Sequence, residues 1–185
     1  MEPEHHEEWF KLQKRAGEIL RNGFSDEPMD RLVLRVLVMP SFAPWSSWEL
    51  YERESRQEFI GAFLTKRTWQ MHNDLEKFRS PVNRLQHPQK LAPTITISTW
   101  EVDESFLVDV VEELCGLQVP VHPGASPLSV DGTSYELTTV LHSMTSEYRW
   151  HENAPQNWRT LQEWTLRWTK RFDEVSQIQP QKSSA

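Results

Sequence analysis

The sequence predicts an α+β fold: a two-layer sandwich in which about three helices pack on a mainly antiparallel sheet of five or six strands. Segments with apolar residues at helical spacing occur among β-forming segments that are mostly neighbours along the chain, and such neighbours usually pair. The length of 185 residues fits one domain, expected over residues 1–176 and followed by a disordered tail over residues 177–185. Helices on one face of the sheet are favoured over helices on both faces.

The fold is expected to open with a helix and a central strand. Residues 5–21 predict an amphipathic helix, because apolar side chains recur there every three or four residues and Asn22-Gly23 supplies a stop signal. Residues 31–39 form an almost unbroken run of β-forming apolar residues that ends at Pro40. Such a run is typical of a strand covered on at least one face.

A hairpin and a long polar segment are expected next. Residues 48–53 and 58–69 predict two strands around a charged turn at residues 54–57. Residues 70–92 are polar and proline-bearing, so they predict a loop, with a short helix through residues 73–79.

An alternating strand then leads to a second amphipathic helix. Residues 94–100 alternate between polar and apolar side chains, and Asp103 is placed to cap a helix that runs to Cys115. Gly116 is placed to adopt the left-handed conformation that ends many helices. Cys115 is expected on or near the buried stripe of this helix, where desolvation would keep its thiol inert.

A second hairpin follows the proline-bearing connector of residues 118–132 and comprises strands over residues 133–142 and 147–151. Pairing through an even-numbered loop would place Leu141 opposite Tyr148. The face expected to be exposed carries Glu136, Val140, Glu147, Arg149 and His151.

The last helix has the strongest pattern in the chain. Large apolar residues, among them Trp164 and Trp168, recur at spacings of three and four, and Pro155 suits the first turn. We expect both tryptophans to be buried against the sheet, and Glu163 to form an exposed ion pair with Arg167.

Charge is unevenly distributed along this acidic chain, whose formal net charge is −7. Residues 101–154 carry ten acidic side chains against Arg149 alone, whereas residues 31–100 carry a dilute basic excess of four. That dilute excess argues against nucleic-acid binding, which needs a concentrated basic face. An acidic protein suits a basic protein partner through complementary fields, although acidity also simply favours solubility.

The sequence predicts a soluble, cytoplasmic protein. Its apolar runs are far too short to span a membrane, and residues 1–14 lack the pattern of a signal peptide. The single cysteine allows no internal disulfide, which suits a reducing compartment.

Catalytic and ligand-binding motifs are missing from the sequence. It has no phosphate-binding glycine loop, no nucleophile elbow and no paired-cysteine metal motif, so we expect no cofactor and no metal. A non-enzymatic protein is therefore favoured. The alternative is a small hydrolase whose site is assembled from residues distant in sequence, using Glu101, Asp103 or a histidine, although helix capping explains Asp103 more economically.

Aromatic residues in one loop and the strand after it point to a protein partner. Phe42, Trp45, Trp48 and Tyr51 belong to the residue types and the loop position that often form binding hot spots. Acidic residues such as Glu136 and Glu147 would steer a basic partner towards this surface. The competing interpretation is that the loop folds over the end of the sheet and covers the core.

Two stretches of the C-terminal third, VPVHPGASPLSVDGTSYEL at residues 119–137 and YRWHENAPQNWRTLQEWTLRW at residues 148–168, resemble a pattern in uncharacterised small bacterial α+β proteins. The pattern joins a proline-bearing connector, a DGT-x-Y-E-L strand, a Y-x-W strand and a P-x-x-W-x-x-L helix. Some proteins of this kind resemble immunity proteins that neutralise toxins. The resemblance implies a toxin as partner, and it carries over no catalytic residue.

Overall fold

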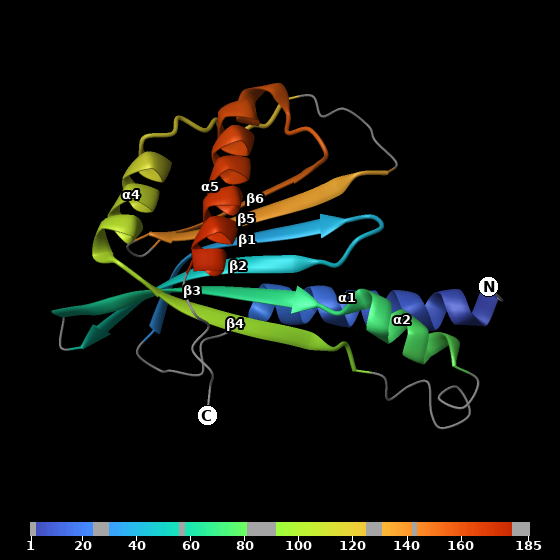
Figure 1. Ribbon diagram of the computed structural model, residues 1–185. Coiled ribbons are helices and arrows are strands. Elements are labelled where there is room, and N and C mark those ends of the chain that lie inside the picture. The colour runs from blue at the N-terminus through green and yellow to red at the C-terminus, as the bar shows by residue number, and fades with distance from the viewer. Residues whose placement is uncertain are drawn as a thin grey trace.

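The computed structural model describes residues 3–23, 30–55, 58–80, 92–124, 131–141 and 144–178, in which one antiparallel sheet is combined with helices (Figure 1). The α-helices are α1 (Pro3–Asn22), α2 (Met71–Arg79), α4 (Glu104–Cys115) and α5 (Arg159–Ile178), and a 3₁₀ turn, Gln156–Trp158, precedes α5. The strands are β1 (Asp30–Pro40), β2 (Ser46–Ser55), β3 (Glu58–Trp69), β4 (Ile95–Val102), β5 (Thr133–Leu141) and β6 (Met144–His151). The predicted α+β fold with a mainly antiparallel sheet is confirmed.

The strand order of the sheet is β4-β3-β2-β1-β5-β6, and every neighbouring pair is antiparallel. Strands β1 to β4 therefore pair in chain order. Strand β5 then returns to the free side of β1, which makes the apolar strand β1 central, as its composition predicts.

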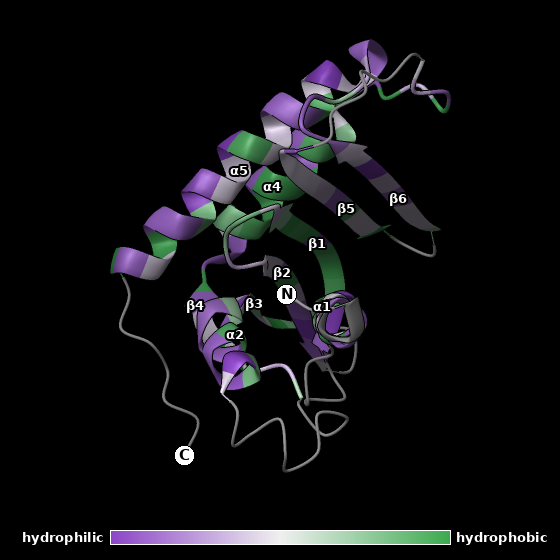
Figure 2. Cartoon of the chain, turned by 90° about the vertical axis from the view of Figure 1, so that its right-hand side faces the viewer, coloured by the Kyte–Doolittle hydropathy of each residue, from purple (hydrophilic) through white to green (hydrophobic). Residues whose placement is uncertain are grey.

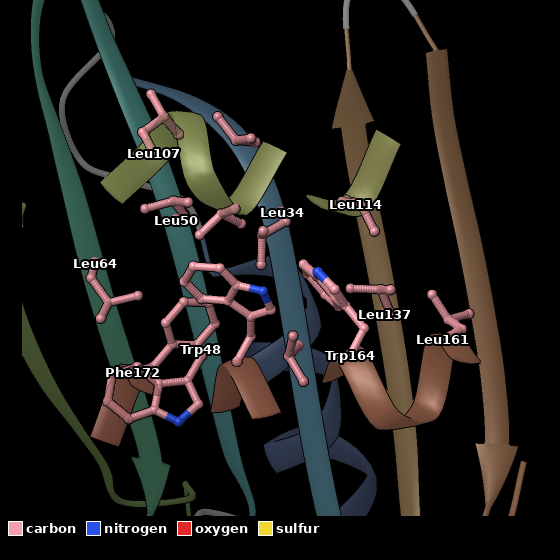
Figure 3. Close-up of a cluster of buried hydrophobic side chains, with 14 of the residues drawn as sticks. Leu34, Trp48, Leu50, Leu64, Leu107, Leu114, Leu137, Leu161, Trp164 and Phe172 are labelled. Atoms are coloured by element: carbon pink, nitrogen blue, oxygen red, sulfur yellow. The ribbon is translucent and has the colours of Figure 1, made fainter. Parts of the chain in front are cut away.

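Helices α4 and α5 cover one face of the sheet and enclose the larger apolar core (Figure 3). Trp164 and Trp168 are 2% and 0% exposed, so the predicted burial of both side chains is confirmed. Trp48 from β2 lies in the same core, against Trp100 and Phe172 at ring-centroid distances of 5.8 Å. We call this side of the sheet the α5 face.

Helix α1 packs on the opposite side, which we call the α1 face (Figure 2). A second, smaller apolar cluster lies there, formed by Leu12, Ala16, Leu20, Leu37, Trp69 and Met71. The preference for helices on one face only is therefore wrong. Apolar spacing shows which side of a helix is buried, but it does not show which face of the sheet receives it.

The β5–β6 hairpin divides its side chains between the two faces as predicted, but its register differs. Tyr148 lies opposite Leu137, and Leu141 lies opposite Met144. The expected pairing of Leu141 with Tyr148 is wrong by an even number of residues, which is why the division of faces survives.

Three local predictions for the helices also need correction. Gly116 has φ −72° and ψ −14°, an ordinary right-handed conformation rather than the left-handed cap. Asp103 does occupy the N-cap position of α4, but its side chain forms no capping hydrogen bond. Arg167 pairs with Glu113 of α4 instead of Glu163, which ties the two helices of the α5 face together.

Some predicted segments lie partly outside the described residues. These are residues 81–91 of the predicted polar loop, residues 125–130 of the predicted connector and residues 179–185 of the predicted tail. Helix α5 continues through Ile178, two residues into the range expected to be tail. No helix in the described part of the chain is both long enough and apolar enough to cross a membrane.

Candidate functional site

The turn between β1 and β2, residues 41–45, is held in place at both of its ends. The Ser41 amide and hydroxyl donate to the Gly132 carbonyl oxygen at 2.9 and 2.8 Å. The Trp45 indole donates to the Pro40 carbonyl at 3.2 Å, and the Trp45 carbonyl accepts from the Trp69 amide at 2.9 Å. The turn therefore presents its tip in a defined geometry.

Phe42 lies at this tip and is 79% exposed. It borders a shallow hollow of about 470 Å³ that is also lined by Ala43, Asp131, Gly132 and Glu152. Gly132 has φ +146°, and a Cβ added there would lie 1.6 Å from a carboxylate oxygen of Glu152. Glycine is thus required where the start of β5 passes close to Glu152.

The other aromatic residues of the predicted contact surface are placed differently. Trp45 is half-buried against Trp69, at a ring-centroid distance of 5.3 Å. Trp48 is 1% exposed on the α5 face, and Tyr51 is 4% exposed on the α1 face. Successive strand residues point to opposite faces, so Trp48 and Tyr51 cannot form one surface with Phe42. Both are buried residues of strand β2 and not part of a loop that folds over the end of the sheet.

The two acidic residues expected to steer a partner also differ from each other. The Glu136 carboxylate accepts two hydrogen bonds from the Arg21 guanidinium, at 2.7 and 2.6 Å, and its side chain is 13% exposed. Glu147 is 55% exposed and pairs with Arg149 at 3.1 Å. Glu136 thus anchors α1 to β5, whereas Glu147 remains accessible to a partner.

Candidate residues for the alternative hydrolase do not converge on the hollow beside Phe42. Glu101 and Asp103 lie at the junction of β4 and α4 and are exposed. The cross-strand neighbours Ser134 and His151 are joined by a hydrogen bond of 3.0 Å between the hydroxyl and Nδ1. In a serine triad the serine bonds one imidazole nitrogen while a carboxylate orients the other. Here Nε2 of His151 is buried and has no hydrogen-bond partner among the described residues. No described carboxylate therefore orients the ring as a triad requires.

A buried ionic cluster, formed by Arg35, Glu49, Tyr51 and Arg67, occupies the α1 face. Glu49 is 0% exposed and accepts hydrogen bonds from Arg35 at 2.8 Å, Tyr51 at 2.8 Å and Arg67 at 3.0 Å. Burial, reinforced by the Glu49 charge, raises the pKa of the Tyr51 hydroxyl, so Tyr51 stays protonated and donates.

The end of α1 completes this cluster. The Gly23 carbonyl oxygen accepts from Tyr51 and from Arg35, both at 3.0 Å, and Arg35 also donates to the Arg21 carbonyl. A Cβ on Gly23 would lie 2.3 Å from Nε of Arg67. The charged groups thus bond to one another and to carbonyl oxygens at the end of α1. We interpret the cluster as structural, because it fixes α1 on the sheet and leaves its charges paired.

The thiol of Cys115 is exposed, so its predicted burial is wrong. The buried residues of α4 are Leu107, Val110 and Leu114, and Cys115 lies about 100° around the helix from Leu114. A step of one residue along the helix therefore separates the buried side chain of Leu114 from the exposed thiol of Cys115. In the part of the chain that the structure describes, no three histidine, cysteine or acidic side chains gather as a metal site would require.

Comparisons with known proteins assign no family to the chain. It matches no protein-family model, no curated protein and no solved structure. The resemblance of residues 119–137 and 148–168 to small bacterial proteins therefore stays a prediction. The function has to be argued from the geometry of the described residues.

Proposed function

We propose that this protein is a non-enzymatic protein-binding domain. It contacts its partner through the turn of residues 41–45, which we call the Phe42 turn. The observation that carries the proposal is the 79% exposure of Phe42 on a turn whose backbone is hydrogen-bonded at both ends. A large aromatic side chain on a preorganised turn loses little freedom on binding, so most of its buried area contributes to affinity.

The charges near the turn suit a basic partner. Asp131 and Glu152 line the hollow beside Phe42, and Glu147 lies exposed on the neighbouring hairpin. Carboxylates around an apolar anchor match the usual anatomy of a contact surface, with an apolar centre and a polar rim. An immunity-type role against a basic toxin is the specific form of the proposal, and it rests on the sequence resemblance.

A photo-crosslinking experiment tests the proposal in the intact chain. Phe42 is replaced by p-benzoylphenylalanine, and the same replacement is made at Ile60, which is 54% exposed at the far end of β3. We expect a discrete protein adduct from position 42 and none from position 60. Equal labelling at the two positions would contradict a specific surface at the turn.

The purified partner then allows a kinetic test. Phe42→Ala should raise the dissociation rate about 30-fold, which corresponds to about 2 kcal/mol, and should change the association rate little. The same variant should leave the free energy of unfolding within about 0.5 kcal/mol of the wild type, because the ring is exposed. Unchanged dissociation kinetics would refute the proposed role of Phe42.

A further inference from the structure

Helix α4 carries charge of only one sign. Its acidic residues are Glu104, Asp109, Glu112 and Glu113, and it contains no lysine, arginine or histidine. Of these, Glu113 is engaged by Arg167 and by the Trp168 indole at 2.8 Å. Glu112 is exposed and forms no ion pair with any described residue.

An apolar groove runs between one flank of α4 and the ends of β1, β2 and β5, with a cavity volume of about 240 Å³. We call it the α4 groove. One wall is formed by Val108, Val111 and Cys115, and the facing wall includes Val33, Val140 and Leu141. Val108 is 41% exposed, so the groove is open to solvent along the helix.

The charged residues at the mouth of the α4 groove are predominantly acidic. Arg31 lines it, but it is engaged by two carboxylates, those of Glu52 and, at 3.5 Å, Glu54. Among the described residues, the groove is lined by the carboxylates of Glu52 and Glu112 and by one guanidinium, to which Glu54 adds a third carboxylate from outside the lining. An apolar lining with a net negative mouth favours a ligand with an aliphatic body and a cationic end.

We propose that the α4 groove binds a lysine side chain from a basic segment of a partner protein. The four-carbon stem packs between Val108, Val111 and the facing valines, and the ammonium group lies at the mouth near Glu112. Lysine fits better than arginine, because the lining is aliphatic and offers no aromatic face for a guanidinium to stack on. An uncharged apolar group would match the aliphatic lining but not the acidic mouth, and an anionic group would be repelled by that mouth.

This surface is separate from the one assigned to Phe42. The α4 groove lies by the first residues of β1, whereas the Phe42 turn follows its last residue. Figure 1 shows helix α4 and the connection between β1 and β2 at opposite ends of the sheet. The inference therefore does not depend on the proposed function. Variants in the groove leave the Phe42 turn intact, so the failure of one proposal can be told from the failure of the other.

Cys115 provides a native reporter of the potential in the α4 groove, since it is the only cysteine in the chain. Two methanethiosulfonate reagents are used, one with an ammonium and one with a sulfonate head. In each case the Cys115 thiolate attacks the sulfenyl sulfur of the reagent, a mixed disulfide with the alkylthio group forms, and methanesulfinate leaves as the S–S bond of the reagent breaks. The measured quantity is the reaction rate of the ammonium reagent divided by that of the sulfonate reagent. We expect this ratio to be about tenfold higher at Cys115 than at a small free thiol, and added salt to lower it. The ratio of the two rates cancels any change in the fraction of thiolate.

A matched pair of variants locates the charge responsible. Glu112→Lys should abolish the preference for the ammonium reagent, whereas Glu163→Lys makes the same change on an exposed position of α5 and should leave it unchanged. If the rate ratio at Cys115 of the wild type equals that of a small free thiol, the assignment of an acidic mouth is wrong. An equal effect of Glu112→Lys and Glu163→Lys would also overturn it, because the field would then be that of the whole protein.

Binding itself is tested with peptides of the sequence Ala-Lys-Leu-Lys-Ala, with both lysines kept, replaced by norleucine or replaced by glutamate. The valine methyl resonances of the protein are followed by NMR. The lysine peptide should shift Val108 and Val111 and bind about five- to tenfold more tightly than the norleucine peptide, and prior modification of Cys115 should block it.

Every other outcome contradicts the inference. Equal binding of the lysine and norleucine peptides would mean that the groove recognises only an apolar chain, and tighter binding of the glutamate peptide would reverse the assignment. If n-butylammonium alone bound as tightly as the lysine peptide, the site would belong to small amines and not to a protein segment. Shifts confined to residues outside the α4 groove would also refute it.

Discussion

The two faces of the sheet hold their helices by different means. On the α5 face, helices α4 and α5 enclose a large apolar core that includes Trp48, Trp164 and Phe172. On the α1 face, a smaller apolar cluster lies beside the buried ionic cluster, and Arg21 of α1 pairs with Glu136 of β5. The α5 face is held by the apolar volume that its side chains fill, whereas the α1 face is held by pairs of particular charged groups.

This contrast teaches that one sheet can respond in two ways to substitution. An apolar core loses stability in proportion to the volume removed, and it recovers when the volume is restored. A buried ionic cluster loses stability when one partner is removed, because the remaining charges stay desolvated. It need not lose any when all of its members are replaced together by apolar residues.

The largest effect is expected from Trp164→Ala on the α5 face. Trp164 is 2% exposed, and its indole nitrogen has no hydrogen-bond partner among the described residues, so packing accounts for its contribution. The free energy of unfolding should fall by about 3–5 kcal/mol in chemical denaturation. The exposed neighbour Glu163→Ala serves as a control and should change it little. A loss below about 1 kcal/mol would show that α5 does not dock as described.

A somewhat smaller effect is expected from Glu49→Gln on the α1 face. The amide keeps the volume but removes the buried negative charge that accepts from both Arg35 and Arg67, so the free energy of unfolding should fall by about 3 kcal/mol. Replacing Arg35, Glu49 and Arg67 together by Met, Leu and Met should recover most of that loss. If the triple variant is less stable than Glu49→Gln, the distinction between the two faces fails.

The smallest effect, and the one with a pH signature, is expected from Asp74→Asn in α2. Burial raises the pKa of Asp74, but hydrogen bonds from Thr94, Trp69 and Lys77 outweigh it, so the pKa lies below its ordinary value. A carboxylate whose pKa is lowered on folding stabilises the protein above its ordinary pKa of about 4 and loses that contribution as pH falls through the folded value.

The variant should therefore lose about 2 kcal/mol at neutral pH, and the difference from the wild type should shrink below about pH 4. Denaturation curves recorded across this range measure the difference directly. Asp109→Asn removes an exposed carboxylate from α4 and should show neither effect. A difference that grows on acidification would mean that folding raises the pKa of Asp74.

Local patterns predicted most of the fold because they report burial directly. The alternation in β5 and β6 correctly separated Leu137 and Trp150 from Glu136 and Arg149, although the register between the strands was missed. Register depends on the turn, and residues 142–143 at that turn lie outside the described residues. The position of α1 was missed because it depends on which face of the sheet remains uncovered, which is a property of the whole fold.

The candidate sites were less predictable. Phe42 could be found from its loop and residue type, but Trp48 and Tyr51 belong to the alternating pattern of β2 and are buried on opposite faces. The buried ionic cluster was missed, although Arg35 interrupts an apolar strand and could have signalled it. The α4 groove could not be predicted, because its walls come from segments that only the return of β5 to β1 brings together.

That return has a consequence for how the chain folds. Val36 pairs with Leu137, about 100 residues later, whereas β1 to β4 pair with near neighbours in the chain. Closing so long a loop is entropically costly, so the four-stranded meander is expected to form before the β5–β6 hairpin docks. During synthesis β1 is then an open, apolar edge until residues 133–141 have been made. The newborn chain is most prone to wrong strand pairing in that interval.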